Sequence, residues 1–355
     1  MNGQHIVVIG AGYAGITAAT GAGRRCRVTL IAPEALFAQR IRQHETAAGH
    51  REHRPALAAL IRGRSVTHRQ ARVGEIDLAG RKVLLEDGEA IGYDTLVYAL
   101  GSSTAWRGVP GAAESAYGVE RAAELRGRVR GAERPGTVAV VGGGATGIEL
   151  AAELAEAYPA WQVRLVAAGR VGGWFSAKGR SHVLRELRRL GVQIQEEAEV
   201  TEVTRQGLLT ARGPVEAEVV VWAAAMEPSP LAAQAGLGVA DDGRALVDDR
   251  LRSLSHPEVH VVGDAASATV AGTGTLRMGC ATALPMGRYV GKLLSGRTSE
   301  PFAYRYTLQC LSLGRRSGLV QLVRGDDAMR PTAYRGLTGR LVKAVILRGV
   351  AASLR

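Results

Sequence analysis

The stretch that decides the fold is HIVVIGAGYAGITAAT, residues 5–20. It passes from a β-branched segment through Gly-x-Gly-x-x-Gly into an alanine-rich segment, which predicts a strand, a tight turn and a helix. Gly10 permits the turn, Gly12 lets the backbone approach a pyrophosphate, and Gly15 lets the helix pack on the strand. The first turn of such a helix has unpaired N–H groups and partial positive charge, so a dinucleotide phosphate site is predicted here.

The same pattern occurs a second time, as TVAVVGGGATGIELAAELAEA at residues 137–157. Gly142, Gly144 and Gly147 take the three glycine positions. A short apolar strand follows each copy, RVTLIA at 27–32 and QVRLVA at 162–167. The chain therefore contains two βαβ openings and has two predicted dinucleotide sites.

These repeats predict an α/β fold with two Rossmann-type dinucleotide-binding domains, the second inserted in the first. Residues 246–300 return to a strand, a Gly-Asp turn and a helix, so we assign 1–110 and 246–300 to the first domain. Residues 111–245 form the second domain, and 301–355 form a small C-terminal α+β interface module.

The two copies differ where an acid should bind the adenosine ribose. After the first copy the strand ends in Ala32-Pro33, and Glu34 follows. Glu34 either binds the ribose hydroxyls from a shifted loop or is an exposed loop acid. After the second copy no acid is present and Arg170 is near, which favours a 2′-phosphate and hence NADPH. If Arg170 is only a surface cation, NADH remains the alternative.

Composition limits the class of protein. Hydrophobic residues make up 46% and charged residues 22%, as in ordinary globular domains. The net charge is +12, but the arginines are scattered, which favours a solvated surface over a nucleic-acid-binding face. The three cysteines lie far apart, and we find no signal peptide and no membrane-spanning segment. We therefore expect a cytoplasmic protein without a local redox dithiol.

The sequence resembles the pyridine-nucleotide-linked FAD oxidoreductases, within them the branch of type II NADH dehydrogenases and apoptosis-inducing-factor-like proteins. Besides the two glycine motifs, the resemblance rests on LVYALGS (96–102), VHVVGDAA (259–266), ALFAQRIRQHETAAG (35–49) and PFAYRYTLQCLSLGRRSGLV (301–320). It implies FAD in the first domain, NADH or NADPH in the second, and hydride transfer between them.

The resemblance also implies roles for single residues. Asp264 would hydrogen-bond the ribityl chain of FAD, and Val73 would pair with the adenine. The helix starting at Cys280-Ala281 would direct its N-terminus at the flavin N1–O2 edge. Glu149 would lie near nicotinamide and flavin, unless it is an ordinary first-turn helix acid. Further cofactor contacts are implied at Tyr13, Ala14, Ala99, Gly101, Ala145, Thr146, Ala225 and Gly263.

This chain departs from the branch at two places. The branch has Ala-Gln beside its quinone site, where this chain has Cys280-Ala281. Its Trp-x-x-Gly segment has become Trp222 to Ala225, without the glycine. The electron acceptor is therefore left open as a quinone-like or other small organic molecule. Cys280 has no cysteine near it in the sequence, and we expect it to pack beside the flavin.

A polar cluster lies in the loop near the expected flavin ring: His44, Glu45, His50, Glu52 and His53. A metal site is conceivable there, but no recognised ligand spacing supports it, so we expect none. His44 or Arg40 would instead lie near the isoalloxazine and assist proton transfer.

The tail GLTGRLVKAVILRGVAASLR (336–355) is expected to form a basic amphipathic helix. Its apolar stripe would pack on its own domain or on a second copy in a homodimer. The alternative is an anionic membrane surface, which would place the protein at the inner face of the membrane.

The predicted function is FAD-dependent hydride transfer from NAD(P)H to a small acceptor. One alternative is a flavoenzyme that acts directly on a biosynthetic intermediate, with the second glycine motif decayed. The other is a non-catalytic redox-sensing scaffold that binds a partner or nucleic acid.

Overall fold

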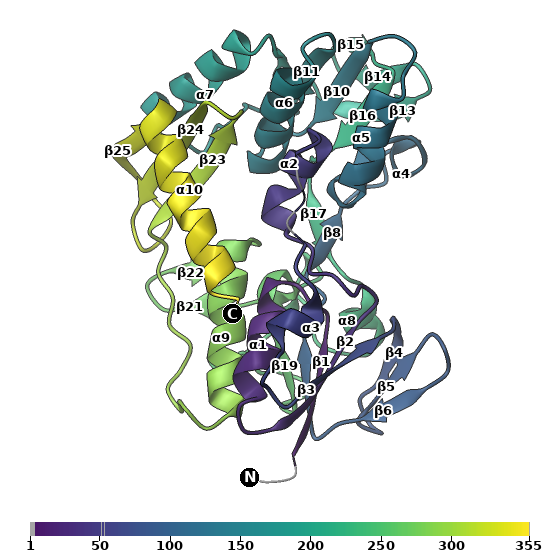
Figure 1. The fold of residues 1–355 in the computed structure, drawn as a ribbon, viewed down its shortest axis with the longest axis vertical. Coiled ribbons are helices and arrows are strands. Elements are labelled where there is room, and N and C mark those ends of the chain that lie inside the picture. Colours follow the sequence, from purple (N-terminus) through teal and green to yellow (C-terminus); the bar gives the residue numbers. More distant parts are fainter. Residues whose placement is uncertain (1–3, 51, 53, 355) are drawn as a thin grey trace.

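Two parallel β-sheets, one in each half of the molecule, form the framework of the computed structural model (Figure 1). The structure describes residues 4–50, 52 and 54–354. The first sheet has the order β19-β7-β1-β2-β3. Its strands are β1 (His5–Ile9), β2 (Arg27–Ala32), β3 (Val66–Gln70), β7 (Thr95–Tyr98) and β19 (Val259–Val261). All four neighbouring pairs are parallel.

The second sheet has the order β12-β11-β10-β16-β9 and is also parallel. Its strands are β9 (Tyr117–Gly118), β10 (Thr137–Val141), β11 (Gln162–Val166), β12 (Gln193–Gln195) and β16 (Val219–Trp222). The whole second sheet lies in the chain between β7 and β19 of the first. The predicted fold class, with one Rossmann-type unit inserted in the other, is confirmed, while the domain boundaries remain predictions.

Smaller elements complete the two halves. Antiparallel sheets form from β4 (Val73–Asp77), β5 (Lys82–Leu85) and β6 (Ala90–Gly92), and from β13 (Val200–Thr204), β14 (Gly207–Thr210) and β15 (Gly213–Glu216). The two chain segments that connect the halves form an antiparallel pair of strands, β8 (Ser102–Thr104) and β17 (Met226–Pro228). The helices of this part are α2 (Gln43–Ala47), α3 (Leu57–Leu60), α4 (Ala112–Ser115), α5 (Ala122–Arg130), α6 (Ala145–Ala157), α7 (Ala177–Arg189) and α8 (Leu231–Gln234).

Two helices of the first half cross at very short range, α1 (Tyr13–Ala22) and α9 (Cys280–Leu294). A Cβ atom on Gly21 would lie 2.8 Å from Gly291 Cα, and one on Gly287 would lie 2.2 Å from the Ala14 carbonyl oxygen. Glycine is therefore required on both helices for the backbones to meet. The crossing holds the N-terminus of α9 beside the first glycine turn.

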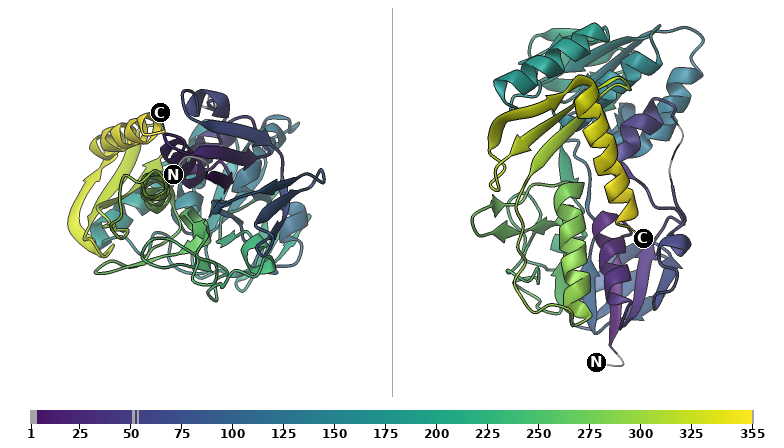
Figure 2. Two further views of the ribbon diagram at one scale, coloured as in Figure 1. Left: turned by 90° about the horizontal axis from the view of Figure 1, so that it is seen from below. Right: turned by 60° about the vertical axis from the view of Figure 1, so that its left-hand side comes forward.

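The C-terminal module consists of β23 (Leu308–Leu313), β24 (Ser317–Val323), β25 (Met329–Arg335) and the helix α10 (Gly336–Ala352). The expected α+β module is therefore present. The helix runs from this sheet towards α1 and α9 (Figure 2), and Arg288 Nη2 on α9 donates to Ser353 O at 3.3 Å. The module thus spans both halves of the chain.

The tail forms the expected helix, but one of its basic side chains, that of Lys343, is buried and not on the surface. Leu337, Leu341 and Val345 are exposed at 58%, 53% and 66%. Lys343, expected among the basic surface residues, is buried at 6% exposure because its side chain points inward to a carboxylate.

Gly291→Val tests the helix crossing. The added Cβ would lie 2.9 Å from Gly21 Cα and 3.0 Å from two backbone oxygens of α1. We expect a loss of about 1–3 kcal/mol in the free energy of unfolding, measured in urea. Gly127→Ala in α5 is the control, since a Cβ there meets nothing within 4 Å, and a gain of about 0.5–1 kcal/mol is expected. Equal stability of Gly291→Val and wild type would contradict the proposed close packing.

Candidate active site

The first glycine turn has the shape that a dinucleotide phosphate requires. Gly10 has φ +96°, and a Cβ there would lie 2.4 Å from Ala99 O. A Cβ on Gly15 would lie 1.8 Å from Gly10 O, so the helix packs directly on the turn. Next to Gly12, by contrast, nothing lies within 4 Å of the added atom. The turn is tight on its protein side and open on the side of the helix N-terminus.

The second turn repeats this arrangement. A Cβ on Gly142 would lie 2.4 Å from Ala223 O, and one on Gly147 would lie 1.9 Å from Gly142 O. Space is again open at Gly144, and Ala145 beside it is exposed. Both turns therefore offer backbone N–H groups to an incoming phosphate.

Asp264 lies where the first turn meets α9. Its Oδ2 accepts from Ser102 Oγ at 2.7 Å and its Oδ1 from the Gly279 amide at 2.7 Å. A carboxylate can accept about four hydrogen bonds, so capacity for a polyol chain remains. Gly263, directly before it, has φ +77° and lies against Ala14, where a Cβ would be 3.1 Å from the Ala14 Cβ.

Some residues predicted to contact FAD have an unsatisfied polar atom or lie beside open space. The buried Tyr13 hydroxyl has no hydrogen-bond partner, and the ring of Tyr13 packs edge-on against Phe37. Gly101, with φ +66°, has nothing within 4 Å of an added Cβ. Val73 begins β4. The residues present fit a bound FAD, and their individual roles remain predictions.

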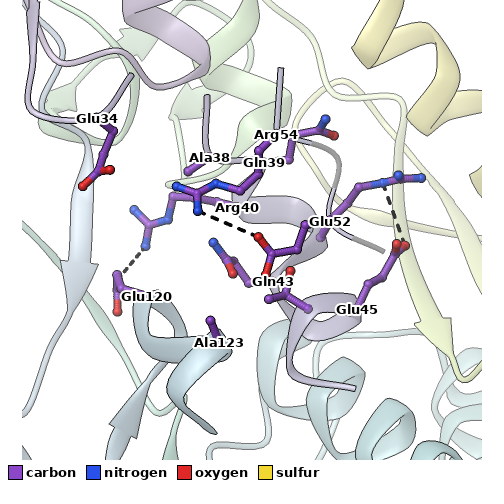
Figure 3. A pocket seen from close by; sticks show the side chains of 12 residues that line it. Glu34, Ala38, Gln39, Arg40, Gln43, Glu45, Glu52, Arg54, Glu120 and Ala123 are labelled. Carbon is purple, nitrogen blue, oxygen red and sulfur yellow. Dashed lines mark hydrogen bonds and ion pairs between the residues drawn. The ribbon is translucent and has the colours of Figure 1, made fainter. Parts of the chain in front are cut away.

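A cavity of about 270 Å³ lies beside this region (Figure 3). Glu34 and Arg40, both predicted to contact FAD, line it. Arg40 donates to Ser102 O and forms an ion pair with Glu120 at 2.9 Å. Arg40 thereby joins the flavin-side loop to the strand that carries Ser102.

A buried charged cluster includes Glu149 of α6, the helix that begins at the second turn. Glu149, near the start of α6, accepts from the Lys343 ammonium and from the Ser312 amide at 2.8 Å. His44 Nδ1 lies 3.5 Å from the other oxygen of Glu149, while His44 Nε2 is buried without a hydrogen-bond partner among the described residues. The structure therefore brings together the two predicted catalytic residues, His44 and Glu149.

The charges of this cluster follow from its burial. Burial acts to raise the pKa of Glu149, but the Lys343 ammonium, together with His44 and the Ser312 amide, holds that pKa below its usual value. Burial lowers the pKa of His44, so its ring is neutral at neutral pH. The cluster then consists of an ammonium, a carboxylate and an imidazole with one free nitrogen.

Cys280 has no cysteine near it in the sequence, but the fold brings Cys310 of β23 close enough to affect its charge. Burial raises the pKa of Cys280 to about 11, and repulsion from Cys310 adds to it. Both cysteines are free thiols. Ala281, next to Cys280, is exposed.

The predicted nicotinamide side contains a carboxylate that sequence reasoning missed. Glu196, just after β12, accepts from the Val171 amide at 2.6 Å and from Arg180 at 2.5 Å. Arg170 is exposed beside Val171, in the loop after β11. Burial acts to raise the pKa of Glu196, but the hydrogen bonds from Arg180 and the Val171 amide, with the charges of Arg180 and Arg170, hold it below its usual value. Ala225 accepts from the Ala105 amide between the two halves at 3.1 Å.

Lys343 was missed because amphipathicity only assigns a helix residue to a face. One signal was available: 45 cations include only four lysines, so a lysine in this tail is unusual.

Within the described ranges, no group of three or more His, Cys, Asp or Glu side chains could hold a metal ion. His53 of the polar loop lies outside the described residues.

Comparison with known proteins identifies the family. The model for pyridine nucleotide-disulphide oxidoreductases matches residues 4–286. The chain belongs to this family. This pyridine nucleotide-disulphide oxidoreductase is 33% identical to the NADH dehydrogenase-like protein Rv1812c of Mycobacterium tuberculosis over 322 residues, 81% of this chain and 78% of that protein. It is 30% identical to the type II NADH:quinone oxidoreductase Ndh of that organism, over 85% of this chain and 76% of that one.

The pyridine nucleotide-disulphide oxidoreductase also shares its fold with NDH2 from Plasmodium falciparum, solved in complex with NADH. The TM-score is 0.82 at 13% identity, over 98% of this chain and 94% of that one. The resemblance drawn from the sequence motifs is confirmed, and the chain is an oxidoreductase of an NAD(P)H-dependent flavoprotein family. In the part of the chain that the structure describes, no helix is long and apolar enough to cross a membrane.

Glu153 is expected to make stability fall as pH rises. It is fully buried one turn beyond Glu149, and burial raises its pKa from 4.5 to about 7. The folded state binds this proton more tightly, so stability is lost between about pH 4.5 and 7 and stays lost above. Glu153→Gln should therefore stabilise the protein more at pH 8 than at pH 5, by at most roughly 3 kcal/mol in the free energy of unfolding, and raise Tm accordingly.

Thermal unfolding at several pH values measures this difference. Glu186→Gln on α7, outside the cluster, is the control carboxylate, paired with Arg189 at 3.0 Å. A pH-independent difference between Glu153→Gln and wild type would contradict the assignment.

Proposed function

We propose that this oxidoreductase binds FAD at the first glycine turn and NADH at the second, and delivers the electrons to a quinone-like acceptor. One observation carries the proposal. The chain has two turns of the same geometry, each open at its central glycine, and the second leads into α6, where Glu149 forms one buried cluster with His44 and Lys343. When bound, FAD would supply the hydride acceptor and electron carrier that side chains cannot supply.

The protein's own part is to position the cofactors and to provide charge and protons. Gly12 and Gly144 leave room for phosphates at two helix N-termini. Asp264 and the start of α9 would hold the polyol chain and the flavin edge. The neutral His44 has a free Nε2 for a proton, and Glu149 holds the ring through Nδ1.

The proposed nucleotide is NADH, although Arg170 alone favoured NADPH. The Glu196 carboxylate lies beside the loop that carries Arg170 and binds the Val171 amide. A 2′-phosphate would be repelled by this carboxylate, whereas ribose hydroxyls could donate to it. The two named relatives above are an NADH dehydrogenase-like protein and an NADH:quinone oxidoreductase, which supports the same choice.

The first test is anaerobic reduction of the bound flavin. We expect NADH to bleach the flavin band, with a kcat/KM about tenfold above that for NADPH, equivalent to roughly 1.4 kcal/mol. Glu196→Gln should reduce this preference, because its amide oxygen can still accept from the Val171 amide while the charge is gone. Stopped-flow absorbance measures both rates.

The same experiment separates the alternatives. Quinones added after bleaching should restore the oxidised spectrum, in spite of Ala281 at the family's glutamine position. FAD-loaded protein that neither NADH nor NADPH bleaches would remove the proposal and favour a direct organic substrate.

We further propose that α10 lies on an anionic membrane surface, near which quinones partition. Leu337, Leu341 and Val345 form an exposed stripe, with Arg340 and Arg348 exposed beside it. Burial of such a stripe combines apolar transfer with attraction to anionic lipids.

Flotation with vesicles tests this surface. Wild type should float with vesicles containing phosphatidylglycerol and less with phosphatidylcholine alone, and Leu341→Asp should reduce flotation several-fold. Leu209→Asp, an exposed leucine on β14, is the control. If wild type does not float and is a dimer that Leu341→Asp dissociates, the stripe is a homodimer interface.

A further inference from the structure

A second buried carboxylate lies on the same face of α6 as Glu149. Glu149, Glu153 and Glu156 are spaced four and three residues apart, which aligns them along one side of the helix. This side faces α2 and the turn between β23 and β24, not solvent. Glu153, in the middle, is 0% exposed.

The contacts of Glu153 lead outward to solvent. Its Oε2 lies 3.3 Å from Nε2 of His50, whose side chain is 34% exposed, and accepts no hydrogen bond from the residues that the structure describes. Its Oε1 lies 3.4 Å from Arg315 Nη1, on the partly exposed turn between β23 and β24. His50 is therefore the titratable group that connects this carboxylate with water.

The contacts also lead inward to the active site. Arg315 Nη1 lies 3.4 Å from Oε1 of Glu45, which is nearly buried and adjoins His44 in α2. His44 lies 3.5 Å from Glu149 and has its Nε2 free. Glu153 is one helical turn from Glu149. Polar contacts therefore run from His50 through Glu153 and Arg315 to Glu45. Glu45 directly follows His44 in the chain, since the two are consecutive residues of α2.

We propose that His50 and Glu153 are a proton-entry route that serves the acceptor side of the site. This inference rests on the proposed function. No part of the mechanism above uses either residue, and the burial of a carboxylate with an unpaired oxygen is costly unless it has a role.

The stoichiometry of the reaction requires such a route. A quinone-like acceptor takes up two electrons and two protons to become a quinol. NADH releases a hydride, which carries two electrons and one proton, and leaves as NAD⁺. One further proton per turnover must therefore come from water into a buried site, through His50, Glu153 and then His44.

The electrostatics suit proton transfer at neutral pH. Burial raises the pKa of Glu153 to about 7, lowered somewhat by Arg315 and raised further by Glu45, Glu156 and Glu149. Burial and Arg315 lower the pKa of His50. The proton affinities of His50 and Glu153 are thus brought closer together, which favours proton transfer between them in either direction.

The test compares two acceptors on the FAD-loaded enzyme. After anaerobic bleaching by NADH, reoxidation by a soluble quinone needs the proton, whereas reoxidation by ferricyanide takes electrons only. In Glu153→Gln and His50→Gln we expect bleaching and ferricyanide rates within twofold of wild type, and quinone reoxidation slowed about tenfold. Imidazole should partly restore the quinone rate in His50→Ala.

Controls separate this proposal from the function on which it rests. Glu186→Gln should leave all rates unchanged. Equal slowing with both acceptors, or none with either, would overturn the proton route while leaving hydride transfer intact. Failure of wild type to bleach would instead refute the proposed function.

One further readout is independent of turnover. Infrared titration should show a protonated carboxyl band near neutral pH that Glu153→Gln abolishes and Glu186→Gln keeps. If Glu153→Gln does not fold, His50→Gln carries the same kinetic expectation, because His50 lies on a partly exposed loop.

Discussion

The Lys343 ammonium on the Glu149 carboxylate is the interaction on which the arrangement of the site depends. It joins α10 of the C-terminal module to α6 of the second Rossmann-type unit, and His44 of the first unit lies against the same carboxylate. Removing either charge would leave the other buried without a partner, which typically costs several kcal/mol. Three segments far apart in the sequence are thereby held at one point.

Burial gives the groups around that pair different charges. Lys343 and Glu149 are close enough to stay ionised, because each stabilises the other. His44 and Glu153 lack a partner of that strength, so burial favours their neutral forms. The result is a fixed pair of charges beside groups that can take up or release a proton, a useful combination for a reaction that moves electrons and protons separately.

The fold was largely predictable because it depends on local chemistry. Each Gly-x-Gly-x-x-Gly turn needs glycine at fixed positions, and the clashes of added Cβ atoms with Ala99 O and Ala223 O show why. Strand, turn and helix are contiguous, so a short window contains the whole signal. Glu149 was predicted from the family resemblance and His44 from the polar loop near the expected flavin, and the structure places the two side chains together.

The sequence by itself determined the two dinucleotide turns, the insertion of one unit in the other and the family. Only the tertiary structure decided which charges meet. Lys343, Cys310, Glu196 and His50 could not be assigned, because periodicity tells which side of an element a residue occupies and carries no information on what packs there. Their partners lie from 16 to 194 residues away along the chain, as with Glu196 and Lys343. Contacts at such separations form only when the sheets, α6 and α10 have packed, and burial then sets which of these groups keep their charge.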